Sequence, residues 1–327
     1  MTPPNPRLRL AEDYVRHTDC NVFLTGKAGT GKTTFLQEVA RTSPKRLVVT
    51  APTGVAAINA GGVTLHSFFQ LPFGPFVPGS EDFTGRHRMR REKKNLIRSL
   101  DLLIIDEISM VRADLLDGVD AVLRRYRRSD RPFGGVQLLM IGDLHQLSPV
   151  VKKNEWELLK DRYGSPYFFS STALALEGMV PVELEQIYRQ SDPRFIELLN
   201  RVRDNRLDPQ TLEALNARHI PGFSPEDQDG TITLCTHNRS ADAINRARMK
   251  ALSGKRRRFR AGLEGDFPEQ ALPTAAVLEL KKGAQVMFIR NDMSPDKLYF
   301  NGKIGTVTRL SRDAVEGHCP GDPAPIP

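Results

Sequence analysis

The first half of the chain alternates short apolar runs with amphipathic segments. The apolar runs predict buried strands, and the segments between them carry apolar residues at helical spacing. We expect strands at residues 21–25, 46–51, 102–105 and 136–141, and helices at residues 32–41 and 55–59. Strands that alternate with helices predict an α/β fold with a doubly wound, largely parallel sheet. The loops at the carboxyl ends of such strands carry the chemistry.

The second half of the chain continues this pattern less completely. Proline and glycine first interrupt it at residues 71–79, which we interpret as an inserted loop. We expect the first domain to finish, and the chain to cross over, at residues 178–190. Beyond that point the pattern predicts helices at residues 193–203 and 238–252, and strands at residues 231–235 and 285–290. These elements start a second α/β unit without completing a sheet of normal width.

The composition of the chain predicts an anionic partner and a cellular compartment. The 327 residues, 39% hydrophobic and 26% charged, are typical of a soluble protein with room for two α/β domains. A formal net charge of +8 favours an anionic partner, most often nucleic acid. Three widely spaced cysteines, no apolar leader and no membrane-length apolar run predict a cytoplasmic protein, in the bacterial cytosol or nucleoid, that is not secreted.

A glycine-rich segment follows the first predicted strand and opens the first predicted helix. It fits the pattern G-x-x-x-x-G-K-T, in which glycines let backbone N–H groups face a phosphate and the helix N-terminus adds its positive dipole. We expect Lys32 to reach the β- and γ-phosphates and the Thr33 hydroxyl to ligate Mg²⁺. A chance glycine-rich turn is the alternative. The residues predicted to bind nucleotide are Gly26, Lys27, Ala28, Gly29, Thr30, Gly31, Lys32, Thr33 and Thr34.

Two adjacent acids, Asp106 and Glu107, follow the strand predicted at residues 102–105. Their position places both carboxylates at the edge of the sheet where the nucleotide binds. We expect Asp106 to hold Mg²⁺, mostly through water, and Glu107 to orient and deprotonate the attacking water. A solvated strand end is the alternative, and the phosphate loop makes it the weaker interpretation.

A third polar segment, at residues 142–149, comes directly after the strand predicted at residues 136–141. Within it, Gln146 has an amide suited to sensing the γ-phosphate or the attacking water. Taken alone, the segment could also be a Gly-Asp turn with an exposed amide.

These segments, in this order, resemble the motifs of the Pif-type (petite-integration-frequency) helicases, relatives of RecD in superfamily one. Two further segments lie between them, Ala-Pro-Thr-Gly-Val-Ala-Ala at residues 51–57 and Thr-Leu-His-Ser-Phe-Phe at residues 64–69. The resemblance covers residues 19–310. It implies a P-loop NTPase with a RecA-like ATP-binding domain at residues 1–180 and an incomplete second RecA-like domain at residues 181–310. Residues 311–327 would then be the truncated start of an inserted β-barrel, or a tail.

The resemblance also implies roles for individual residues. The family's contacts to single-stranded DNA fall on Thr53, Gly54, Thr64, His66, Thr236 and Asn238. Hydroxyls, an imidazole and loop N–H groups suit phosphate contacts, whereas Phe68 and Phe69 could either stack on a base or pack in the core. Arg189 matches the family's arginine finger, although by itself it could be a surface arginine. The catalytic residues are therefore predicted to be Lys32, Glu107, Gln146 and Arg189.

Two departures from the family pattern affect what we expect. The first glutamine of the chain is Gln37, so none precedes the phosphate loop, where the family carries one that reads adenine. The preference for ATP over GTP therefore stays open. The family's last two motifs are absent, and we expect the chain to be a fragment that stops within the inserted barrel. Three basic runs, at residues 86–94, 124–128 and 255–260, are either solvated surfaces or nucleic-acid contacts.

Together these features predict an ATP-dependent DNA helicase or translocase that moves 5′-to-3′ in DNA repair, recombination or telomere maintenance. ATP would be its substrate, Mg²⁺ its cofactor and single-stranded or forked DNA its partner, and the protein would be monomeric. Two alternatives remain from the residues alone: a P-loop ATPase without DNA activity, and a nucleotide-binding fragment without helicase activity. Stimulation of ATP turnover by an oligonucleotide would distinguish the helicase from the first alternative.

Overall fold

A computed structural model of the chain describes two compact units, Met1–Ala217 and Arg218–Pro327. The described residues are 5–72, 74–78, 89–188, 192–222, 231–262, 274–289, 292, 294, 296, 298–299 and 302–326. Among them, no helix is both long enough and apolar enough to cross a membrane.

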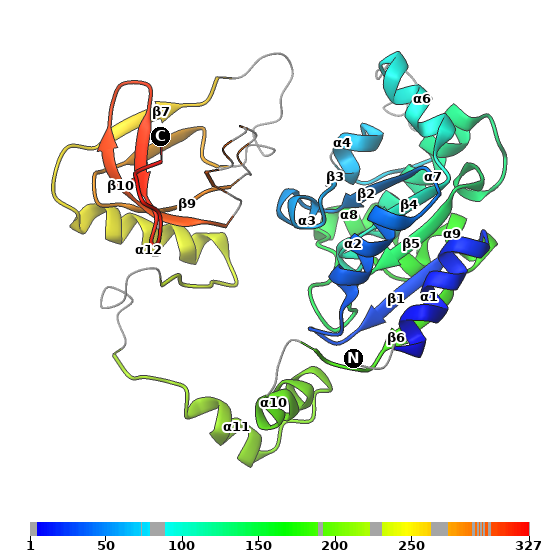
Figure 1. Cartoon of the computed structure of the whole chain (residues 1–327), viewed down its shortest axis with the longest axis horizontal. Coiled ribbons are helices and arrows are strands. Elements are labelled where there is room, and N and C mark those ends of the chain that lie inside the picture. The colour runs from blue at the N-terminus through cyan, green and yellow to red at the C-terminus, as the bar shows by residue number, and fades with distance from the viewer. Residues whose placement is uncertain are drawn as a thin grey trace. The chain divides into compact units, whose positions relative to one another are not determined.

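The first unit is built around a six-stranded sheet in the order β3-β2-β4-β5-β1-β6 (Figure 1). Every pair of neighbouring strands in it is parallel. The predicted doubly wound parallel sheet is therefore confirmed. Its strands are β1 (Val22–Gly26), β2 (Leu47–Ala51), β3 (Val63–Thr64), β4 (Leu102–Ile105), β5 (Gln137–Ile141) and β6 (Val180–Leu184).

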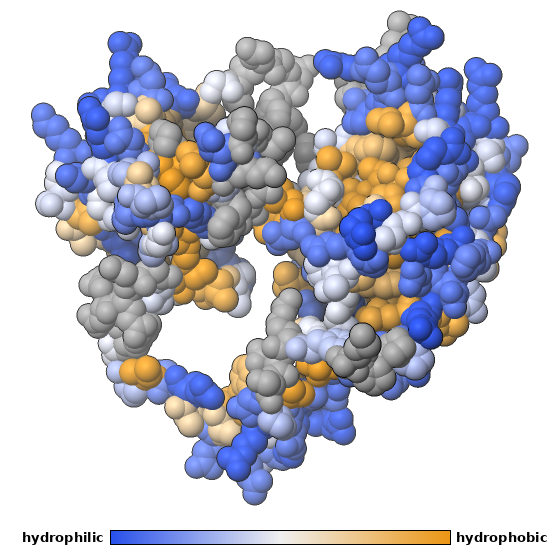
Figure 2. All heavy atoms as spheres, viewed as in Figure 1, coloured by the Kyte–Doolittle hydropathy of each residue, from blue (hydrophilic) through white to orange (hydrophobic). Residues whose placement is uncertain are grey.

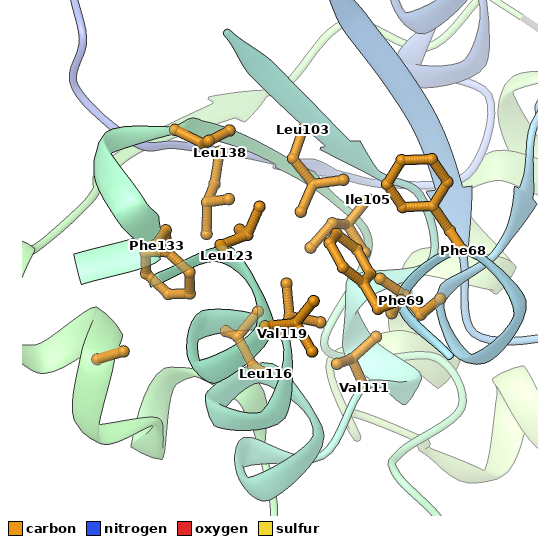
Figure 3. Packing of buried hydrophobic residues seen from close by; sticks show 14 of the residues in the cluster. Phe68, Phe69, Leu103, Ile105, Val111, Leu116, Val119, Leu123, Phe133 and Leu138 are labelled. Carbon is orange, nitrogen blue, oxygen red and sulfur yellow. The ribbon is translucent and has the colours of Figure 1, made fainter. Parts of the chain in front are cut away.

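Helices lie on both faces of this sheet because successive strand residues point to opposite faces. On one face, Val22, Leu24 and Ile104 pack with residues of α1 (Pro6–His17) and α2 (Lys32–Thr42). On the other face, Leu103, Ile105 and Leu138 pack with Leu116, Val119 and Leu123 of α7 (Ala113–Arg127) (Figure 3). The other helices in the described part of the first unit are α3 (Gly54–Asn59), α4 (Leu65–Phe69), α6 (Arg91–Ser99), α8 (Lys153–Leu159), α9 (Thr172–Glu177), α10 (Pro193–Arg203) and α11 (Pro209–Asn216).

The packing decides between the two interpretations of the aromatic pair in α4. Phe68 and Phe69 are only 7% and 1% exposed, and both belong to the core cluster that covers Leu103 and Ile105. Their rings meet edge to face, with centroids 4.9 Å apart. The pair therefore anchors α4 to the sheet and presents no free face for a base to stack on.

The first sheet extends past the domain boundary expected after residue 180. β6 begins at Val180 and pairs with β1 along its whole length, so it is an integral strand of the first sheet. α10 and α11 follow within the same unit, which runs to Ala217.

The second unit contains the helix α12 (Asn238–Ala251) and two small antiparallel sheets. One sheet pairs β7 (Arg257–Arg260) with β8 (Val277–Leu280); the other has the order β11-β10-β9. The strands of the second sheet are β9 (Gln285–Met287), β10 (Ile304–Leu310) and β11 (Val315–His318). Because β10 and β11 form one hairpin, the expected division after residue 310 falls inside a single sheet.

The strand expected at residues 231–235 is not formed. These residues have no regular secondary structure, and Leu234 is 89% exposed. The physical reason is that a strand needs a neighbouring strand to satisfy its N–H and C=O groups, and none pairs with this segment among the described residues. Figure 2 shows apolar side chains exposed among charged ones on the viewed surface of this unit, whose exposed apolar residues include Val277, Met287 and Ile289.

A buried carboxylate on α7, that of Asp117, connects this helix to Tyr163, Ser171 and the N-terminus of α9. Asp117 accepts hydrogen bonds from the Tyr163 hydroxyl at 2.9 Å and the Ser171 hydroxyl at 2.5 Å. It also accepts from the backbone N–H groups of Thr172 and Ala173, at 3.2 and 3.1 Å, so that it caps the N-terminus of α9. Burial, followed by the Asp117 charge, raises the pKa of the Tyr163 phenol, which keeps its hydroxyl a donor.

We expect Asp117→Ala to lower the free energy of unfolding of the first unit by about 3 kcal/mol, because it leaves two buried hydroxyls without an acceptor and the α9 N–H groups uncapped. Urea unfolding followed by circular dichroism measures the change. Asp161→Ala, at an exposed aspartate, is the matched control. A loss below about 1 kcal/mol for Asp117→Ala would contradict this role.

Candidate nucleotide and nucleic-acid site

The glycine-rich loop connects β1 to α2, as its sequence predicts. Gly26, Gly29 and Gly31 have φ values of +146°, +80° and +93°, in a region that side chains disfavour. A Cβ atom on Gly26 would lie 2.5 Å from the carbonyl oxygen of Leu184 in β6, so a larger residue would displace the neighbouring strand. Thr30 is fully buried and donates from its hydroxyl to the Lys27 carbonyl at 2.8 Å, which closes the loop.

Lys32 lies at the start of α2 with its ammonium folded back over the loop. Its Nζ donates to the carbonyl oxygens of Gly26 at 2.6 Å and Lys27 at 3.0 Å. Burial lowers the pKa of Lys32, and the nearby carboxylates of Asp143 and Glu107 oppose that shift. Gly31 precedes the helix and provides no side-chain cap, so the first N–H groups of α2 are left for an external acceptor.

The two predicted acids lie directly after β4. The backbone N–H of Asp106 donates to the Thr50 carbonyl at 2.8 Å, which carries the β2–β4 ladder one residue further. Glu107 has a left-handed backbone, with φ of 51°, that turns the chain into the short 3₁₀ helix η1 (Ile108–Met110). Burial raises the pKa of both carboxyls, and in Glu107 the neighbouring Asp106 charge adds to the shift.

The polar loop after β5 is organised by Asp143, which is 3% exposed. Its carboxylate accepts from the His145 N–H at 3.1 Å and from Nε2 of Gln146 at 3.2 Å. It also pairs with Arg203 at the end of α10, with Nη2–Oδ1 at 3.1 Å. Burial alone would raise the pKa of Asp143, but the hydrogen bonds from Arg203, His145 and Gln146 outweigh it and the pKa is lowered.

A cavity of about 350 Å³ brings these segments together. Of the residues predicted to bind the nucleotide or Mg²⁺, four do not line this cavity: Gly26, Lys27, Thr30 and Asp106. Asp106 nevertheless directly precedes Glu107, which does. Tyr188 lines the cavity as well and is missed by reasoning from the sequence; its N–H donates to the Gly29 carbonyl at 2.7 Å. The only signal for it in the sequence is its position directly before Arg189, the predicted arginine finger. Arg189 itself lies outside the described residues. The lining residues are Ala28, Gly29, Gly31, Lys32, Thr33, Thr34, Glu107, Gln146 and Tyr188.

The residues expected to contact DNA in the first unit lie at the carboxyl ends of β2 and β3. These strands are neighbours, with Ala51 paired to Thr64. The Thr53 hydroxyl accepts from the Ala56 N–H, and the Thr64 hydroxyl from the Ser67 N–H, both at 3.2 Å. Each threonine therefore caps a short helix, α3 or α4, at the same edge of the sheet as the phosphate loop.

Gly54 and His66 complete this group. Gly54 is the exposed first residue of α3, and a Cβ atom there would meet nothing within 4 Å. His66 lies in α4; burial and then the positive charge of Arg112 lower its pKa, which favours the neutral imidazole at pH 7. Thr236 and Asn238 belong to the second unit, where the Thr236 hydroxyl lies 2.9 Å from Nδ1 of His237 and Asn238 begins α12.

Several arginines of the predicted basic runs make contacts within the protein. In α7, Arg124 pairs with Asp120, and Arg127 donates to the carbonyl oxygens of Leu100 and Gly134, each at 2.8 Å. These contacts are structural. In the second unit Arg256 and Arg258 both pair with Glu279. Arg86 and Arg88 lie outside the described residues.

A strand, a glycine-rich loop and a helix, with paired acids directly after another strand of the same parallel sheet, define a P-loop nucleotide-binding protein. A family model described as PIF1-like helicase matches residues 9–211. The chain belongs to this family, which confirms the resemblance read from its motifs.

Individual relatives agree with this assignment. The ATP-dependent DNA helicase PIF1 of Homo sapiens is 37% identical over 305 residues, which cover 88% of this chain and 44% of that protein. The same-named protein of Emericella nidulans is 33% identical over 311 residues, which cover 90% of this chain and 40% of that protein. The chain thus spans less than half the length of these curated relatives.

Solved structures of Bacteroides Pif1 have the same fold. The structure bound to single-stranded DNA is 40% identical with a TM-score of 0.80, over 96% of this chain and 71% of that chain. The complex with ADP-AlF3 and single-stranded DNA is 40% identical with a TM-score of 0.81, over 98% of this chain and 73% of that chain.

The raised pKa of Glu107 predicts a pH-dependent stability. A carboxyl whose folded-state pKa is raised above its ordinary value of 4.5 costs stability as the pH rises from 4.5 through the folded pKa, and the cost persists at higher pH. We therefore expect Glu107→Gln to unfold at a higher urea concentration than the wild type at pH 7, and the gain to vanish near pH 4. Glu213→Gln, at an exposed glutamate, is the control. An equal gain at both pH values would contradict the explanation.

Proposed function

We propose that this chain is the ATP-binding part of an ATP-dependent DNA helicase or translocase that acts on single-stranded DNA, moving 5′-to-3′. The observation that carries the proposal is the single cavity lined by Lys32, Thr33, Glu107 and Gln146, which supplies a phosphate cradle, an acid and an amide in one place. Relatives named as ATP-dependent DNA helicases, and the Bacteroides Pif1 complexes with ADP-AlF3 and single-stranded DNA, support it.

The phosphate loop would hold the triphosphate of ATP. Gly26, Gly29 and Gly31 shape the loop, and the uncapped N-terminus of α2 offers N–H donors and a positive dipole to the phosphates. The Lys32 ammonium, which donates to loop carbonyls only 5 and 6 residues away, needs a short movement to reach the phosphate oxygens. Tyr188 borders the same cavity and closes it on the side of Gly31.

The residues here fit a divalent cation. Burial raises the pKa of Asp106 and Glu107, so their negative charges are under-compensated by protein groups, and a cation would offset them. Thr33 and Asp106 supply the hydroxyl and carboxylate oxygens that Mg²⁺ prefers. When bound, Mg²⁺ neutralises charge on the phosphate oxygens.

Each of the remaining site residues would have its own role in hydrolysis. Glu107 would accept a proton from the attacking water, because its raised pKa makes it a better base than an exposed carboxylate. The Gln146 amide would orient that water or contact the γ-phosphate. Arg189 would supply positive charge to the transition state as an arginine finger.

Two adjacent strands would couple the nucleotide site to the DNA site. β4 carries Asp106 and Glu107, and its neighbour β2 leads to Thr53 and Gly54; the Asp106 N–H donates to the Thr50 carbonyl. A shift of the acids on ATP binding would therefore also move the N-termini of α3 and α4. We propose that these N-termini hold the DNA backbone through Thr53, Gly54, Thr64 and His66.

Further parts of the proposal concern the whole protein. We propose that Thr236 and Asn238 add DNA contacts from the second unit, and that residues 218–327 belong to the second RecA-like domain with its inserted barrel. We propose that the protein works as a monomer on single-stranded or forked DNA, in a cytoplasmic compartment that contains DNA. Its processes would be repair, recombination or telomere maintenance.

Two substitutions separate binding from hydrolysis. We expect Lys32→Ala to abolish ATP binding or hydrolysis, because the phosphates lose their cation. Glu107→Gln should bind ATP within about threefold of the wild type and lose about 100-fold or more in turnover, because only the base is removed. Fluorescent-nucleotide titration and a phosphate-release assay measure the two quantities, with Lys160→Ala on the surface as control. Near-normal turnover by Glu107→Gln would remove Glu107 from its role.

DNA binding can be tested by placing a negative charge where DNA is expected. Gly54→Asp should weaken binding of a short single-stranded oligonucleotide about tenfold at low salt, because it adds an anion at an open position without a clash. Gly164→Asp adds the same charge at another open glycine and should leave affinity unchanged. Each phosphate that the wild type neutralises should contribute about 0.7 to the slope of log affinity against log salt. A flat salt profile would contradict the DNA site.

A further inference from the structure

Arg203, the last residue of α10, occupies the centre of the charge network beside the phosphate loop. It makes a two-contact ion pair with Asp143, with Nη2–Oδ1 at 3.1 Å and Nε–Oδ2 at 3.4 Å. The two side chains are 17% and 2% exposed, so the pair is largely shielded from water. In addition, the carbonyl oxygen of Arg203 lies 3.3 Å from Nδ1 of His145 in the same loop.

The position of α10 depends on this pair because little else buries the helix. None of its residues is buried. Its apolar residues Ile196, Leu199 and Val202 line a hollow of about 340 Å³ against Lys27 and Ala28 of the phosphate loop. A helix held over a hollow mainly by one shielded ion pair, with one further contact to His145, has low local stability, and its attachment is sensitive to the charges around that pair.

The same carboxylate fixes the Gln146 amide. Oδ2 of Asp143 accepts from Nε2 of Gln146 at 3.2 Å and from Nε of Arg203 at 3.4 Å. With its NH₂ group turned to Asp143, the amide of Gln146 leaves its oxygen to accept from a water or substrate donor. Arg203 thus determines the orientation of Asp143, and Asp143 determines which end of the amide faces the cavity.

We propose that Arg203 is a positioning residue for ATP hydrolysis, which acts through Asp143 to orient Gln146. The proposal rests on the proposed ATPase function. The ion pair that holds α10 shares its carboxylate with Gln146, so the helix is linked directly to the residue that Arg203 is proposed to position.

The test is a double-mutant cycle on the full chain, with ATP hydrolysis measured as kcat and KM. Arg203→Gln should lower kcat about tenfold and change KM less than about threefold, because orientation of the amide matters most in the transition state. In a Gln146→Ala background the same substitution should lower kcat less than about twofold, because the group that it positions is gone. Arg203→Lys, which keeps the charge with a less rigid geometry, should recover part of the loss.

Arg201→Gln is the matched control, because Arg201 lies on the same helix and is also ion-paired, but with Glu197 and Asp208 away from the cavity. It should leave kcat unchanged. A second readout is hydrogen exchange of residues 193–203 in the nucleotide-free chain, which should be faster in Arg203→Gln than in the wild type.

The outcomes separate the two proposals. If the wild-type chain hydrolyses no ATP, the proposed function fails, whatever the exchange data show. If the wild type hydrolyses ATP and Arg203→Gln retains its kcat, or lowers kcat equally with and without Gln146, the positioning role of Arg203 is wrong while the ATPase assignment stands. Unchanged exchange in α10 would overturn the inference that this pair holds the helix.

Discussion

The site depends on one constraint of parallel sheets, namely that all strands end at the same edge. In the order β3-β2-β4-β5-β1-β6, the three strands β4, β5 and β1 lie side by side. They deliver the acids, the Asp143 loop and the phosphate loop to one place. All four residues of β4 and all five of β5 are buried, so packing on both faces holds these strand ends and the side chains that follow them.

Around the cavity at this edge, negative side chains outnumber the ammonium group that they surround. Asp106, Glu107 and Asp143 lie around one ammonium, Lys32, and burial raises the pKa of the first two. Asp143 differs because Arg203 and two further donors hold its carboxylate ionised. The unit therefore keeps charged groups that reduce its stability, as expected where protein groups are arranged to receive a charged ligand.

The arrangement of strands also places the proposed DNA contacts beside the chemistry. β2 is hydrogen-bonded to β4, and the loops after β2 and β3 begin with threonines that cap α3 and α4. Phe68 and Phe69 anchor α4 in the core instead of facing a ligand. This region thus combines a rigid apolar support with polar helix termini, which suits contacts to a phosphate backbone more than recognition of particular bases.

The sequence by itself determined the local parts of this protein: the strand–loop–helix around Lys32, the acids after β4, the alternating pattern that makes a parallel sheet, and the family. These features depend on neighbouring residues, so their spacing is sufficient to predict them. Only the tertiary structure decided that Phe68 and Phe69 are core residues, that Tyr188 borders the cavity and that Arg203 pairs with Asp143 across 60 positions of sequence. It also left residues 231–235 without a strand partner in the described part of the chain. Such contacts depend on which segments the topology brings together, and no local pattern encodes that.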